Sequence, residues 1–163
     1  LSSAASDVYK RQFQMSSVEF FTMVKEHLNE NGVMVVNMNM RGNNEGNINQ
    51  YLSDTIASVF DHIVTVDVDG STNRELYASS NADMVKTLEN NANETGHSDL
   101  RDMMLHVADT SSVYEAGDYI MTDDKAPVEL LGMQVIDQLI QGEVAYYKDI
   151  FEKDGINGLL ESL

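Results

Sequence analysis

The feature that most constrains the fold is a continuous apolar run at residues 33–36 (VMVV). Such a run suits a strand that is covered on both faces, as in a parallel sheet flanked by helices. A helical pattern precedes it, because apolar residues recur at helical spacing from Phe20 to Leu28, after a capping-box motif at residues 16–19 (SSVE). We therefore expect a helix followed by a buried strand.

Helix and strand patterns continue to alternate along the rest of the chain. In order, they are a helix at 48–59, a strand at 64–68, a turn at Asp69-Gly70, a strand at 76–78, mostly helical residues at 82–108 with a break near 93–96, and a long helix at 127–153 with weak points at Gly132 and Gly142. This order predicts an α/β fold, and 163 residues favour one domain.

Charge and composition exclude several classes of function. Lysine and arginine total 10 against 27 acids, and the formal charge of −17 disfavours binding to nucleic acid or anionic lipid. Cysteine is absent, which removes disulfides, thiolate nucleophiles and cysteine-ligated zinc. The four histidines have no metal-ligand spacing. No apolar stretch approaches the roughly 20 residues of a membrane helix, so we expect a soluble chain. The absence of cysteine fits the cytoplasm, and the histidine spacing predicts no metal site.

Two segments resemble the spermidine synthase-like family, aminopropyltransferases built on the class I methyltransferase fold. "EFFTMVKEHLNENGVMVVNMN" resembles the helix and fifth strand of that domain, and "TDDKAPVELL" resembles a motif near the end of a bacterial branch that is often fused to a membrane transporter-like region. The resemblance extends from Phe13 to about Ile140. It implies the C-terminal half of a Rossmann-like fold, in the order helix-strand-helix-strand-strand, followed by C-terminal helices.

The resemblance also implies a chemistry, the transfer of an aminopropyl group from decarboxylated S-adenosylmethionine to a diamine. Members of the family bind this cofactor, or S-adenosylmethionine itself, through a glycine-rich turn. No GxGxxG or GxGxG motif occurs in this chain. We expect the cofactor turn and the catalytic acid to lie upstream, so that this chain alone is inactive and contains no catalytic residue. The alternative is a non-catalytic methyltransferase-fold module that binds a partner or a small cation.

Residues 1–12 (LSSAASDVYKRQ) contain Asp7-Val8-Tyr9, an acid and a phenol of the kind that can end a catalytic strand. The small and hydroxyl residues before them cannot form the buried strand that carries the catalytic acid in the family, because they have little apolar surface to bury. The stretch also resembles a translated sequencing-adaptor tail. We therefore expect a non-native tail at 1–12 and the C-terminal part of a spermidine synthase-like domain at 13–163. A native loop is the alternative.

The first candidate binding residues follow the apolar strand. Asn44 and Glu45 end a polar loop that leaves the carboxyl end of this strand, which is where open α/β sheets place ligands. A loop rich in Asn and Gly is also typical of a simple turn. Polyamine-using members carry a Gln-Gly-Glu-Ser-like segment here, whereas residues 41–45 of this chain are RGNNE, and that departure puts the polyamine substrate in doubt.

The second pair of candidates is Asp123 and Asp124, just before Pro127. One interpretation is that an aspartate caps the helix that follows and complements its positive end. The other is that one of them binds the ammonium group of a polyamine. We expect Asp123 to bind substrate and Asp124, which is nearer to Pro127, to cap the helix.

Partners follow from the same observations. The resemblance implies a small-molecule polyamine and, in a longer protein, an upstream transporter-like region that would tether it to the membrane. Without further strands, the 33–37 strand would also leave an apolar sheet edge unpaired, which favours a homodimer.

Overall fold

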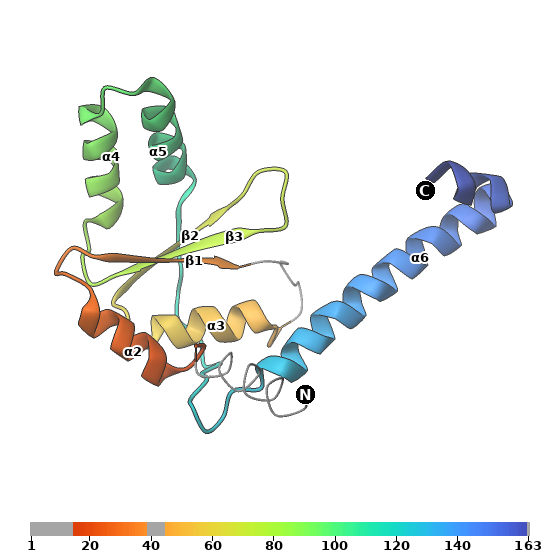
Figure 1. Ribbon diagram of the computed structural model, residues 1–163, viewed down its shortest axis with the longest axis horizontal. Helices are drawn as coiled ribbons and strands as arrows, with labels where there is room; N and C mark the ends of the chain where they lie inside the picture. The colour runs from red at the N-terminus through yellow and green to blue at the C-terminus, as the bar shows by residue number, and fades with distance from the viewer. Residues whose placement is uncertain (1–14, 39–44, 163) are drawn as a thin grey trace, which may run out of the picture. The chain divides into compact units, whose positions relative to one another are not determined.

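The computed structural model describes residues 15–38 and 45–162 (Figure 1). Its elements are α2 (Val18–His27), β1 (Val33–Met38), α3 (Ile48–Ala57), β2 (His62–Asp67), β3 (Arg74–Ser79), α4 (Met84–Glu94), α5 (Ser98–Thr110), β4 (Ser112–Val113) and α6 (Val128–Ser162). This arrangement confirms the predicted α/β class. The chain comprises two compact units, Leu1–Pro127 and Val128–Leu163.

The four strands form one sheet in the order β1-β3-β2-β4. β3 lies between β1 and β2 and is antiparallel to both, with Leu76 paired to Val36 on one side and to Thr65 on the other. β1 and β2 therefore run parallel to each other without touching. The expectation of a parallel sheet around residues 33–36 was wrong for the pairing of β1, whose partner among the described residues is the antiparallel β3. The sheet is compatible with part of a methyltransferase-like fold.

One face of the sheet carries the hydrophobic core. Leu76 and Ala78 of β3 are fully buried there against Phe21 of α2 and Ile56 of α3. Both helices lie on the same side of the strands (Figure 1). Burial of a side chain the size of Leu or Ile contributes about 1.5–3 kcal/mol, so these contacts stabilise the sheet on this face.

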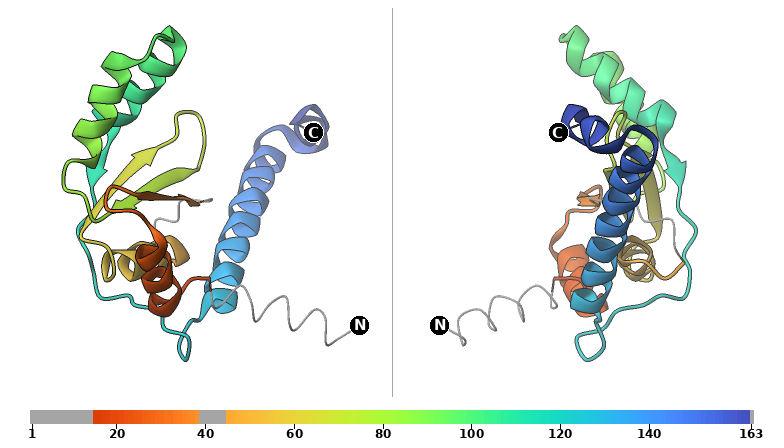
Figure 2. Two further views of the ribbon diagram at one scale, coloured as in Figure 1. Left: turned by 60° about the vertical axis from the view of Figure 1, so that its left-hand side comes forward. Right: turned by 90° about the vertical axis from the view of Figure 1, so that its right-hand side faces the viewer.

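The opposite face is covered less completely by α4 and α5, which lie side by side as a helical hairpin (Figure 2). A groove of about 340 Å³ separates these helices from β1 and β3, and Val35 and Tyr77 are among its lining residues. Val35 is 52% exposed and Val33 is 41% exposed. The expectation that this strand is covered on both faces was therefore also wrong.

Local sequence signals explain where the first two helices begin. Ser17 is the N-cap of α2, where its hydroxyl accepts a hydrogen bond from the Phe20 N–H at 3.3 Å. Asn47 caps α3 in the same way, because its Oδ1 accepts from the Gln50 N–H at 3.0 Å. The N-cap of α2 thus lies one residue after the Ser16 position of the predicted capping box.

Turns and breaks follow the sequence pattern closely. Gly70 adopts a φ of 69° in the turn between β2 and β3, a conformation that favours glycine. Residues 95–97 separate α4 from α5 as predicted, whereas α6 continues through Gly132 and Gly142. Among the described residues, no helix combines the length and hydropathy needed to cross a membrane.

Candidate functional site

The segment between β4 and α6 carries both candidate aspartates, and a buried carboxylate on α3 holds this segment in place. Asp54 is fully buried. Its Oδ1 accepts hydrogen bonds from the Tyr114 hydroxyl at 2.6 Å and the Gly117 N–H at 3.0 Å, and its Oδ2 accepts from the Tyr119 N–H at 3.1 Å. We call these four residues the Asp54 clamp. It fixes residues 114–119 against α3.

The clamp combines close packing with charge. A Cβ atom at Gly117 would lie 2.6 Å from Asp54 Oδ2, so only glycine allows the backbone to approach this carboxylate so closely. Desolvation, followed by the hydrogen bond to Asp54, raises the pKa of the Tyr114 phenol well above its usual range. Tyr114 therefore remains a neutral hydrogen-bond donor at physiological pH, and the Asp54 carboxylate accepts its hydrogen bond.

Thr55, the next residue of α3, extends this attachment. Its Oγ1 accepts a hydrogen bond from the Met121 N–H at 2.9 Å and donates one to the Tyr51 carbonyl at 2.6 Å. Met121 is fully buried. The attachment to α3 therefore continues to the residue that precedes the Thr122–Lys125 turn.

Glu45, one of the predicted site residues, lies just before α3 and contacts the same segment. Its Oε1 accepts a hydrogen bond from the Tyr119 hydroxyl at 3.2 Å. The Tyr119 ring packs against Tyr51 with centroids 4.9 Å apart and lies 3.4 Å from the Cβ position of Gly46. Desolvation and then the charge of Glu45 raise the pKa of Tyr119. Asn44, its predicted neighbour in the site, lies outside the described residues.

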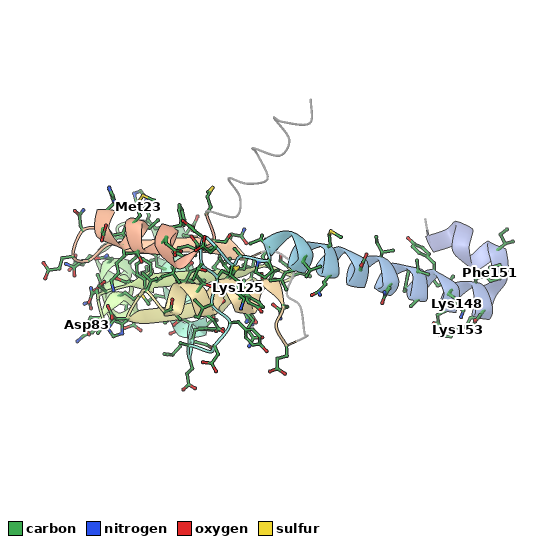
Figure 3. All side chains as sticks on the ribbon, turned by 90° about the horizontal axis from the view of Figure 1, so that it is seen from below. Met23, Asp83, Lys125, Lys148, Phe151 and Lys153 are labelled. Carbon is green, nitrogen blue, oxygen red and sulfur yellow. The ribbon has the colours of Figure 1, made fainter. Side chains whose placement is uncertain are left out.

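Asp123 and Asp124 occupy a tight turn in which Thr122 and Lys125 exchange backbone hydrogen bonds of 3.2 and 2.9 Å. Lys125 is labelled in Figure 3. Asp123 is tied to the start of α2, because its Oδ1 accepts from the Ser17 hydroxyl at 2.5 Å and its N–H donates to Glu19 Oε2 at 3.0 Å.

Asp124 is exposed, and its carboxylate has no hydrogen bond or ion pair with any described residue. The expectation that Asp124 caps the following helix was wrong. α6 begins at Val128, so Pro127 precedes it, and neither aspartate stands at the N-cap position. The cap-like contact of this turn is instead the bond between Asp123 and Ser17, at the start of α2.

The structure brings Glu45 to the segment that carries the two aspartates, but not into contact with them. Four residues lie between Tyr119 and Asp124, so their Cα atoms are at most about 18 Å apart. Carboxylates of this kind accept hydrogen bonds from a cationic amine. Asp54 and Tyr114 were missed by the sequence analysis, because α3 carries several polar residues and no local pattern marks Asp54 as the buried carboxylate among them.

The described residues do not fit an adenosyl cofactor. Glycines with positive φ, where a phosphate or adenosyl group can approach the backbone, occur at Gly46 and Gly70 in this part of the chain. Gly46 packs against the Tyr119 ring, and Gly70 lies in the β2–β3 turn with nothing within 4 Å of its Cβ position. Neither belongs to a glycine-rich turn, so no chemical step is assigned to a cofactor here.

Comparison with known proteins adds a strong similarity. No protein-family model matches the chain. A protein of Bifidobacterium longum (strain NCC 2705), named probable polyamine aminopropyl transferase, is 48% identical over an alignment of 168 positions, and the alignment includes 93% of this chain. The chain spans 38% of the length of that relative. The chain is therefore similar to one part of a protein that is named as a polyamine aminopropyl transferase.

Proposed function

We propose that this chain is the C-terminal part of a spermidine synthase-like aminopropyltransferase, in which a longer protein transfers an aminopropyl group from decarboxylated S-adenosylmethionine to a diamine. The observation that carries the proposal is the 48% identity to a probable polyamine aminopropyl transferase over 93% of the chain. The α/β sheet, with β3 between β1 and β2, is compatible with it.

The role of the chain in this reaction is to hold the amine substrate. Transfer needs a neutral amine as nucleophile, while the other end of the diamine stays a charged ammonium group. We assign that ammonium group to Asp124, because its carboxylate is exposed and has no partner among the described residues. Glu45 is a second ligand in the proposal, and the Asp54 clamp positions the segment on which Asp124 stands.

The remaining parts of the proposal concern what surrounds the chain. The cofactor turn and the catalytic acid belong to the longer protein, which acts in the cytoplasm and is tethered to the membrane by a transporter-like region. Residues 1–12 lie outside the described residues and are proposed to be a non-native tail. The apolar edge at β1 is proposed to pair either with the rest of the protein or with a second copy.

The test is a chimera in which this chain replaces the aligned segment of the Bifidobacterium longum protein. We expect the chimera to transfer aminopropyl groups from decarboxylated S-adenosylmethionine to 1,4-diaminobutane, and this chain alone to neither bind the cofactor nor transfer. The unmodified relative and the relative without its segment are the controls. An active relative paired with a folded but inactive chimera would contradict the proposal and favour the non-catalytic module.

Substitution of the two aspartates in the active chimera separates substrate binding from folding. Asp124→Ala should raise the Michaelis constant for 1,4-diaminobutane about tenfold with little loss of stability, because an ammonium contact is lost. Asp123→Ala should instead lower the free energy of unfolding by about 1 kcal/mol, because its bond to Ser17 is lost. Asp118→Ala, an exposed change in the same segment, is the control. Unaltered kinetics in Asp124→Ala would remove this residue from the site.

A further inference from the structure

A second polar cavity lies at the carboxyl end of β2, outside the residues of the Asp54 clamp. Its volume is about 290 Å³, and its lining residues are Thr65, Asp67, Asp69, Arg74, Thr110 and Ser112. The sheet register explains why they meet, because Asp67 pairs with Arg74 across β2 and β3, and Thr65 pairs with Ser112 across β2 and β4. Residues directly opposite in an antiparallel pair lie on the same face of the sheet.

Thr65 is the member of this cavity that points to a ligand. It is 9% exposed, and its hydroxyl forms no hydrogen bond with any described residue. Among the described residues, every side-chain nitrogen or oxygen that is fully enclosed has a hydrogen-bond partner. The Thr65 hydroxyl has none, so it is not fully enclosed. The Thr65 hydroxyl therefore opens into the cavity that it lines, where a bound group can reach it.

The charges around Thr65 favour a cation. Arg74 donates to both oxygens of Asp67, from Nε at 2.6 Å and from Nη2 at 3.2 Å, so these two charges largely neutralise each other. Asp69 adds a second carboxylate to the lining, and this carboxylate lies 3.5 Å from the imidazole of His106. The Thr110 hydroxyl already donates its proton to the His106 carbonyl at 2.7 Å, so only its lone pairs remain to accept.

We propose that this cavity binds a primary alkylammonium ion. The ammonium group donates to the Thr65 and Thr110 hydroxyls and faces the carboxylate of Asp69, while the alkyl chain extends toward solvent. A primary ammonium group has three N–H donors, which matches a site rich in acceptors. The proposal does not rest on the proposed function, because it concerns none of the residues between Tyr114 and Lys125.

The test follows the backbone amide signals of the whole chain by NMR during titration with n-butylammonium chloride. We expect shifts at the cavity residues and a dissociation constant that rises at least about tenfold in Thr65→Val, because a hydrogen bond to a charged group is lost. Valine keeps the β-branched shape that suits a strand. Glu26→Gln, an exposed change on α2, should bind like the unmodified chain, and melting temperatures check that both variants fold.

A second variant and a second ligand probe the sign of the charge. Asp69→Asn should weaken n-butylammonium binding about threefold in low salt and less in high salt, since Asp69 is exposed. Sodium sulfate should leave the cavity signals unchanged. Equal binding by Thr65→Val and the unmodified chain would overturn the proposal. So would sulfate shifts at Arg74 without n-butylammonium shifts, because they would indicate an anion site.

Discussion

The two faces of the sheet differ in how completely they are covered, although the same strands build both. On the face of α2 and α3, Leu76 and Ala78 are fully buried, and polar groups of the Asp54 clamp are paired. On the face of α4 and α5, a groove of about 340 Å³ remains and Val35 is 52% exposed. An apolar strand residue is thus buried only where the rest of the chain supplies a helix to cover it.

The largest expected effect comes from the closed face, at its buried carboxylate. Asp54→Ala should lower the free energy of unfolding by about 4 kcal/mol, because it leaves the Tyr114 hydroxyl and two backbone N–H groups without their acceptor. Asp118→Ala, on the same segment but exposed, should change it by less than about 0.5 kcal/mol. Urea unfolding measures both. Similar small losses would mean that solvent reaches the clamp.

A pair of truncations compares the apolar parts of the two faces directly. Leu76→Ala should cost about 3 kcal/mol, because Leu76 is fully buried and its removal leaves a cavity. Val35→Ala should cost less than about 1 kcal/mol, because half of its surface is already exposed. Equal costs in urea unfolding would show that the groove is closed in solution, and the contrast between the faces would disappear.

Alkaline pH gives a smaller effect with a definite sign. Desolvation raises the pKa of Tyr114 on the closed face and, to a lesser degree, that of Tyr77 in the groove. A raised tyrosine pKa contributes stability that is complete below the unfolded value of about 10 and is lost as pH rises above it. The free energy of unfolding should therefore fall above about pH 10, less steeply in Tyr114→Phe than in Tyr77→Phe. The reverse order would contradict the additional effect of the hydrogen bond between Tyr114 and Asp54.

The smallest expected effect concerns the proposed tail. Deletion of residues 1–12 should leave the urea midpoint unchanged, because a non-native tail has little apolar surface to bury on either face. A separate deletion, of the α6 segment from Val128 onward, controls for the general effect of shortening the chain. A clear fall in the urea midpoint on removing residues 1–12 would mean that the tail covers part of the sheet. The groove between the sheet and α4 and α5 would then be the first candidate for the covered surface.

Local signals in the sequence predicted the positions of the helices and strands well. They did not predict which strands pair with each other. The helical spacing and N-cap side chains located α2 and α3, and Asp69-Gly70 located the β2–β3 turn. The position of β3 could not be predicted, because an apolar strand pattern does not specify which strand it pairs with.

The candidate site was predicted less completely, for the same reason. Asp123, Asp124 and Glu45 were found as acids in suggestive loops, but the partners that hold Asp123 and Glu45 are remote in sequence. Asp54 accepts its bonds from residues 60 to 65 positions away. Nothing near Asp54 in the sequence marks it as buried, and a single unpaired polar residue such as Thr65 is visible only once the strands are assembled.

The central position of β3 also sets an order of events during folding. β2 and β3 are joined by a short turn and pair locally, whereas Val33 of β1 pairs with Ser79, 46 positions further along the chain. Closing the longer loop costs more chain entropy, and β1 has no described partner until β3 exists. The β2–β3 hairpin is therefore the template on which the sheet is assembled, and β1 docks after it has formed. Substitutions in this hairpin should slow refolding, whereas those in β1 should mainly speed unfolding, a difference that refolding kinetics can measure.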